Sequence, residues 1–181
     1  MNAKVMYDDP DFQQGASSLF WANLGENDGA MAAFEKKQNL TWQRASQAFS
    51  SASLFPASGV TPEGLSKDFV GDNWFVAAIA ALAEFPGRVE KLFLNENKQQ
   101  SRTGVYAVNI FTLGFPQTIL VDDFLPMTKS ADGKSFATLY AQSVWAGILE
   151  KVLAKRFGNY DHIITGIPSE AIQLLTGQPF Q

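Results

Sequence analysis

An apolar run that begins directly after a polar turn limits the possible folds of this 181-residue chain more than any other feature. The turn is Gly71-Asp72, and the run extends from Trp74 to Phe85 without the period of two that a half-buried strand requires. Asp is a favoured N-cap residue, and Pro86-Gly87 ends the run. The pattern predicts a helix that is apolar on almost every face and therefore buried. A further turn is expected over 88–93.

A second helix is predicted over Trp145 to Phe157, where apolar residues recur at spacings of three and four and Gly158 follows as a C-cap. This pattern is amphipathic, so we expect the charged residues of the segment to lie on its solvated side. They are Glu150, Lys151 and Lys155. Nearer the C-terminus, Ser169 is expected to cap a short helix over 170–175.

Two segments rich in β-branched and aromatic residues, 104–111 and 117–121, flank Leu113-Gly114 and predict a hairpin. The second strand ends at Asp122-Asp123, and 127–133 is expected to be rich in turns. Adjacent acids at a strand end can bind a cation, but neighbours in a strand point to opposite faces. We therefore favour a turn or a buried hydrogen-bonding role for one of the pair.

Residues 1–65 are polar and are broken by short aromatic clusters at Leu19-Phe20-Trp21 and Trp42-Gln43-Arg44. Such a segment cannot build its own core, so we expect an extended anchoring arm whose aromatic residues dock on the later half. Residues 66–181 would then form the folded domain.

Composition excludes several classes of function. The formal net charge is −4 and the 14 Lys and Arg residues are scattered, so nothing favours nucleic acid as a partner. Cysteine is absent, which excludes disulfides, thiolate chemistry and Cys-ligated zinc. Met1 to Pro10 contains two Asp and no apolar run, and no segment has the length of a membrane span. We therefore expect a cytoplasmic protein.

A helix that follows a Gly-Asp turn is where papain-type enzymes place a nucleophile, because the helix N-terminus favours a thiolate. Here that position is Asn73, an amide that cannot ionise. His162 is the one histidine, and a Ser-His-Asp site with Ser169 or Ser66 is formally open. Because the Gly-x-Ser-x-Gly elbow is missing, we interpret His162 as a surface or partly packed residue.

Six blocks of sequence occur in one order: YDDPDFQQGASSLFW, WQRA, GDNWFVAAIAALAEFPGRV, VDDFLP, WAGILEKVLAKRFGNY and LTG. Together they resemble the first half of the protease core of the calpain-type cysteine proteases, over nearly the whole chain. The resemblance implies a papain-like α+β fold with a central buried helix, a small antiparallel sheet, packed helices and an N-terminal arm. It also implies that residues 66–181 are the first subdomain, and that the second subdomain, which carries the catalytic His and Asn of the family, is absent from this chain.

The resemblance also implies where the chemistry has changed. In the family a Cys attacks the peptide and a Gln contributes to the oxyanion hole, and the matching positions here are Asn73 and Lys67. The turn residues Gly71 and Asp72 and the helix residue Trp74 are retained. A nucleophile and a neutral donor are therefore both lost.

The family further binds calcium in this half through backbone carbonyls and two acidic residues. The matching positions are Gly64 and Ser143, which carry no carboxylate. Because a hard divalent cation needs charged oxygen ligands, we expect no calcium at these positions. We expect no other metal and no other cofactor.

The leading interpretation is a catalytically inactive calpain-like pseudoprotease with a structural, scaffolding or protein-binding role. Its expected partners are other protein subunits, or a second copy, on the face that the second subdomain normally covers. Degenerate calpain-like proteins of protists add an expectation of association with flagella, cortex or cytoskeleton. One alternative is part of a calcium-dependent cysteine endopeptidase whose nucleophile and second subdomain come from elsewhere. Another is a module that binds peptides without cutting them.

Overall fold

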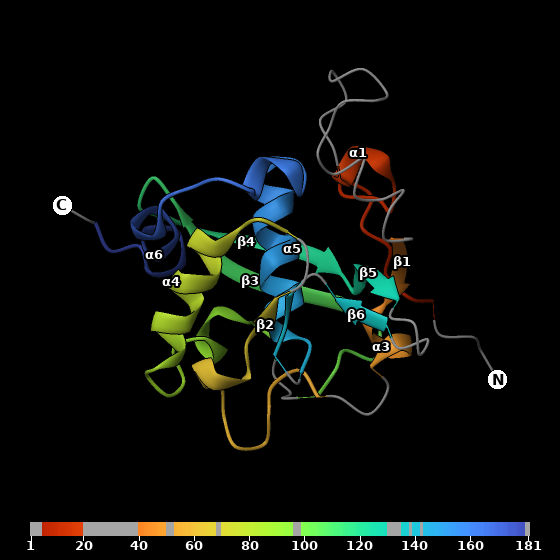
Figure 1. Ribbon diagram of the computed structural model, residues 1–181, viewed down its shortest axis with the longest axis horizontal. Helices are drawn as coiled ribbons and strands as arrows, with labels where there is room; N and C mark the ends of the chain where they lie inside the picture. Colours follow the sequence, from red (N-terminus) through yellow and green to blue (C-terminus); the bar gives the residue numbers. More distant parts are fainter. Residues whose placement is uncertain are drawn as a thin grey trace.

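The computed structural model describes residues 5–19, 40–49, 53–67, 70–95, 99–129, 135–137, 139–141 and 143–179. Within them the protein has a mixed α+β fold, as predicted, that combines short helices with small antiparallel sheets (Figure 1). No described helix has the length and apolar character needed to cross a membrane.

The described helices differ widely in length. The α-helices are α1 (Ala16–Leu19), α3 (Ala45–Ala48), α4 (Asn73–Ala83), α5 (Trp145–Phe157) and α6 (Pro168–Thr176), and the 3-10 helices are η1 (Pro62–Gly64), η2 (Glu90–Leu92) and η3 (Asp161–Ile163).

All described strands pair antiparallel, in three separate sheets. The first has the order β1 (Thr41–Arg44), β5 (Phe124–Lys129), β6 (Ser135–Ala137). The second pairs β2 (Ser66–Lys67) with β7 (Leu139–Tyr140), and the third pairs β3 (Val105–Thr112) with β4 (Phe115–Asp122). The predicted hairpin is therefore confirmed, with Leu113-Gly114 as its turn.

Helix α5 is the central buried helix of the fold, and Figure 1 shows it crossing strands β3 and β4. Every residue from Trp145 to Ala154 is buried, including Glu150 and Lys151. The prediction that these two charged residues lie on a solvated side is therefore wrong. Lys155 is also largely covered, with 17% of its side chain exposed.

Helix α4 is covered on one side only, so the prediction that it is buried on almost every face is also wrong. Its buried residues are Phe75, Ala78, Ile79, Leu82 and Ala83. Ala77 and Ala81 are exposed on the opposite side. Alanine favours the helical conformation and exposes little apolar area, so an all-apolar sequence can form a helix with one open side.

Two further predictions about local structure need correction. Residues 127–129, expected within a turn-rich segment, complete strand β5, because Met127 is buried in the core and all three residues pair with β6. The rest of that segment, 130–133, lies outside the described residues. The further turn expected over 88–93 is confirmed as η2.

The predicted arm docks on the later half through Phe12, Leu19 and Phe55, which are buried in the core, and through Trp42, which packs against it. Phe20 and Trp21 lie outside the described residues. The arm is not simply extended, because it contains β1 and α3 and β1 pairs with β5. The domain boundary between residues 65 and 66 stays a prediction.

Candidate functional site

The candidate site is the start of helix α4. Asn73 is the first residue of the helix and is exposed. Its backbone N–H donates to the carbonyl of Gly71 at 2.8 Å. Asp72 occupies the N-cap position, as predicted, but its side chain is fully buried and forms no capping hydrogen bond. The solvent-exposed side chain at the first position of the helix is therefore a carboxamide.

The residues around Asn73 are fixed by packing against 163–166. The Trp74 indole nitrogen donates to the carbonyl of Ile163 at 2.7 Å. A Cβ atom at Gly166 would lie 2.4 Å from Cε2 of that indole ring, and one at Gly71 would lie 2.8 Å from Cγ2 of Ile164. Only glycine fits at either position without displacing its neighbour. The Gly-Asp turn and Trp74 therefore hold α4 against this segment.

The predicted degenerate oxyanion position, Lys67, lies in β2, whose backbone pairs with Leu139 of β7. Its side chain lies outside the described part of the structure. Ser66 is its neighbour in the same strand and pairs with Tyr140.

The two positions assigned to calcium by the resemblance lie close together. The Ser143 hydroxyl donates to the carbonyl of Ala141 at 3.1 Å, and a Cβ at Gly64 would lie 3.6 Å from that same carbonyl oxygen. Ser143 is fully buried. Among the described residues, no group of three or more His, Cys, Asp or Glu side chains is arranged to hold a metal ion.

His162 lies in η3, directly after α5. Its ring nitrogen Nδ1 is 2.6 Å from the carbonyl of Phe157, and its amide donates to the side chain of Asn159 at 2.9 Å. It is partly packed, as predicted. Ser169 is inside α6, whose N-cap is Ile167 and whose first turn contains Pro168, so the prediction that Ser169 caps this helix is wrong. Proline is favoured at that point because it needs no amide partner.

Asp122 and Asp123 are both fully buried and both accept hydrogen bonds, where a buried role was predicted for one of them. Asp122 accepts from the Lys151 amine at 2.5 Å and from the amides of Asp9 and Phe124, each at 2.8 Å. The Lys151 amine also donates to the carbonyl of Phe124 at 2.6 Å. Burial lowers the pKa of Lys151, and the charge of Asp122 opposes that shift.

Asp123 points the other way and accepts from Arg44 Nη1 and from the Ser46 hydroxyl, at 2.5 and 2.7 Å. Arg44 also contacts Asp8 and the carbonyl of Tyr7. A second lysine, Lys155, donates to both carboxylate oxygens of the buried Asp9 at 2.7 Å. We call Asp9, Asp122, Lys151 and Lys155 the arm–helix ion network, because it joins residues 7–14 to α5.

The sequence reasoning did not identify Arg44, Asp9 or Lys151 as structurally important. The available signal was their presence in the blocks YDDPDF, WQRA and LEK, each of which places a charge beside aromatic or aliphatic residues. Charged residues are rarely buried unless they are paired, but a single sequence does not show which charges pair.

Comparison with known proteins identifies the family of this chain. The calpain family cysteine protease domain matches residues 7–181. The chain is 30% identical to mouse calpain-10 over 97% of its own length and 26% of that protein, and 30% identical to the rat calpain-1 catalytic subunit over 96% and 23%. It is 28% identical to the chicken calpain-2 catalytic subunit over 95% and 24%. The chain thus spans about a quarter of these relatives. It belongs to the calpain family of cysteine proteases.

Proposed function

We propose that this chain is a catalytically inactive calpain-family domain that acts by binding other proteins. The observation that carries the proposal is Asn73 at the start of α4, in a chain of 181 residues without cysteine. A carboxamide has no ionisable proton near neutral pH, and a neighbouring base cannot turn it into a nucleophile. The thiolate chemistry of cysteine proteases therefore has no source within this chain.

Packing supports the same proposal. Trp74 is held by Ile163 and Gly166, so the residues that surround the lost nucleophile have a role that does not need catalysis. Selection for a stable protein is enough to retain the turn once its chemistry is gone. The exposed side chain of Asn73 then marks a surface that is open to a partner.

The proposed partner is another protein subunit or a second copy of this chain. It would bind the surface that includes Asn73. Ile167, at the entrance of α6, is 55% exposed and follows the segment that packs on Trp74.

Cytoplasmic location and association with the cytoskeleton stay predictions. A calcium-dependent endopeptidase that obtains its nucleophile from another chain is the alternative, because the relatives include calpain catalytic subunits.

A peptidase assay tests the proposal. The purified chain is incubated with an unstructured polypeptide and with a fluorogenic peptide, each with and without calcium, and products are read by mass spectrometry. We expect no specific cleavage in any arm. Cleavage that disappears in Asn73→Ala or His162→Ala would overturn the proposal, and the exposed variant Ala81→Ser is the matched control for protease contamination.

Calcium binding is a separate readout. With Gly64 and Ser143 at the positions where the family has carboxylates, isothermal titration of the chain with calcium is expected to show no saturable heat. Saturable binding at micromolar calcium would favour the calcium-regulated alternative.

A further inference from the structure

Strand β4 has one edge that is open in the described structure. Both turn residues of the β3–β4 hairpin have positive φ angles, 51° at Leu113 and 82° at Gly114, as a two-residue type I′ turn requires. The pair that closes such a turn exchanges hydrogen bonds, and bonded pairs then alternate along the ladder. The C=O groups of Pro116, Thr118 and Leu120, and the N–H groups of Thr118 and Leu120, therefore point away from β3.

Contacts on both sides of the hairpin confirm this alternation. On the β3 side, Ala107 accepts from the Leu94 amide at 2.8 Å and donates to the Asn95 side chain at 3.1 Å, so residues 93–95 cover that edge. On the β4 side, the Leu120 carbonyl accepts from Lys155 Nζ at 2.9 Å. Within the described ranges no strand pairs with β4 on this side, and nothing bonds to the amide and carbonyl of Thr118.

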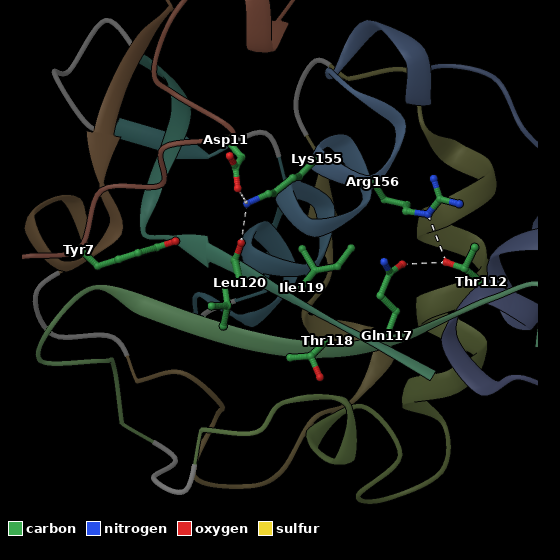
Figure 2. Close-up of a pocket in the computed structure, with 9 residues that line it drawn as sticks. All are labelled: Tyr7, Asp11, Thr112, Gln117, Thr118, Ile119, Leu120, Lys155 and Arg156. Carbon is green, nitrogen blue, oxygen red and sulfur yellow. Dashed lines mark hydrogen bonds and ion pairs between the residues drawn. The ribbon is translucent and has the colours of Figure 1, made fainter. Parts of the chain in front are cut away.

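A groove of about 640 Å³ runs along this edge, between β4, the last turn of α5 and the arm (Figure 2). Figure 2 shows Asp11 and Leu120 towards one end of the groove and Arg156 towards the other, with Lys155 between Asp11 and Arg156. The Asp11 side chain is 81% exposed and lies 3.9 Å from Lys155. Arg156 bonds to the Thr112 hydroxyl at 3.2 Å, and no carboxylate pairs with it in the described part of the chain. The groove thus has an acidic end and a basic end.

We propose that this edge binds the same edge of a second copy of the chain. In the proposed dimer, two β4 strands run antiparallel about a two-fold axis at Thr118 and form one four-stranded sheet. A two-fold interface uses the same surface of both copies, so that surface must be complementary to itself. The two ends of the groove meet this condition, because antiparallel pairing brings Arg156 of each copy towards the acidic end of the other.

The backbone of the edge meets the same condition. With Thr118 opposite itself, Pro116 of each copy lies opposite Leu120 of the other. Proline has no N–H to donate, and the Leu120 carbonyl opposite it already accepts from Lys155. The Leu120 amide can still donate to the Pro116 carbonyl. The side chains of this cross-strand pair face the same side of the sheet, so Leu120, now 45% exposed, would be covered by proline.

The inference goes beyond the proposed function, since it concerns a different surface and holds whether or not the chain cleaves peptides. Sedimentation equilibrium of the full chain tests it, from micromolar to millimolar concentration. We expect a reversible monomer–dimer equilibrium. In Arg156→Asp and in Asp11→Arg, association should weaken about tenfold or more because like charges then meet. The double variant Asp11→Arg/Arg156→Asp restores opposite charges, so its association should return to within about threefold of the original.

A backbone variant gives an independent test. Thr118→Pro removes an N–H that points out of the hairpin, so the fold keeps its ladder while the dimer loses its central hydrogen bonds. Thr118→Ala is the matched control, because it loses the same hydroxyl contact to Asn109 but keeps the amide. We expect loss of dimer in the first variant and retention in the second, and circular dichroism checks that both are folded.

Several outcomes would overturn the inference. They are a monomer at every concentration, a dimer that Thr118→Pro and Arg156→Asp leave unchanged, and a double charge variant that fails to recover. Binding of a polyglutamate peptide to a chain that stays monomeric, when Arg156→Asp abolishes that binding, would assign the groove to an acidic partner instead.

Discussion

The arm–helix ion network and the start of α4 join distant segments of the chain by different contacts. The network places Asp9, Asp122 and Lys151 where water does not reach, and pairs them at 2.5 to 2.8 Å. The start of α4 leaves Asn73 exposed and surrounds it with packing of Trp74 on Gly166. In the network, ion pairs join distant parts of the chain. At the start of α4, the close packing of side chains joins them.

The largest effect is expected from breaking the network at Lys151. In Lys151→Met the carboxylate of Asp122 stays buried without its cation, and the loss of one partner from such a pair costs about 3–5 kcal/mol. The matched control is Lys91→Met, an exposed lysine of η2, with an expected change below about 0.5 kcal/mol. Urea unfolding measures both. Equal free energies of unfolding for the two variants would show that the network does not hold the arm.

The stability of the fold at alkaline pH tests the burial of the Tyr106 hydroxyl. Burial raises the pKa of Tyr106 to about 12, from its ordinary value of 10.0. A raised folded-state pKa gives stability that is complete below pH 10 and is lost as the pH rises towards 12. For a shift of this size the loss is about 3 kcal/mol.

The variant Tyr106→Phe should lose less stability over this alkaline range than the original chain. At neutral pH it should already be less stable by about 1 kcal/mol, because the hydroxyl accepts from the Ser101 amide. Urea unfolding at a series of pH values checks both expectations. Identical alkaline slopes for the two proteins would contradict the assignment to Tyr106.

A smaller effect is expected where α4 packs on 163–166. In Gly166→Ala the new methyl group overlaps the Trp74 indole, and overpacking of this kind costs about 1–3 kcal/mol. Gly15→Ala is the control, because nothing lies within 4 Å of a Cβ at that position. Thermal unfolding compares the two. If Gly166→Ala is as stable as the control, the indole is not held as tightly as the geometry indicates.

The sequence predicted those elements whose signals are local. The hairpin at Leu113-Gly114 depends on turn residues and neighbouring strands, and the helix ending at Gly158 depends on spacing and a C-cap, so both were found. Residues 127–129 of strand β5 were missed, because they are stabilised by pairing with β6 and, at Met127, also with β1. Pairing between separate segments leaves no pattern within the segment itself.

The errors about charge have the same origin. Glu150 and Lys151 match an amphipathic pattern, and only the approach of Asp122 makes burial of the lysine favourable. The reverse holds for α4, whose apolar sequence does not reveal which side meets the core. The residue that follows the Gly-Asp turn, in contrast, is a property of the sequence itself, and Asn73 is the first residue of α4. Its assignment to a lost nucleophile stays a prediction.

The most direct test of the central claim, that the start of α4 is retained for packing and not for chemistry, compares the free energies of unfolding of Trp74→Ala and Asn73→Ala in urea. We predict a loss of about 3 kcal/mol for Trp74→Ala, since the partly buried indole packs on Gly166 and bonds to Ile163. For Asn73→Ala we predict a loss below about 1 kcal/mol, because this side chain is exposed. A larger loss in Asn73→Ala than in Trp74→Ala would contradict the account.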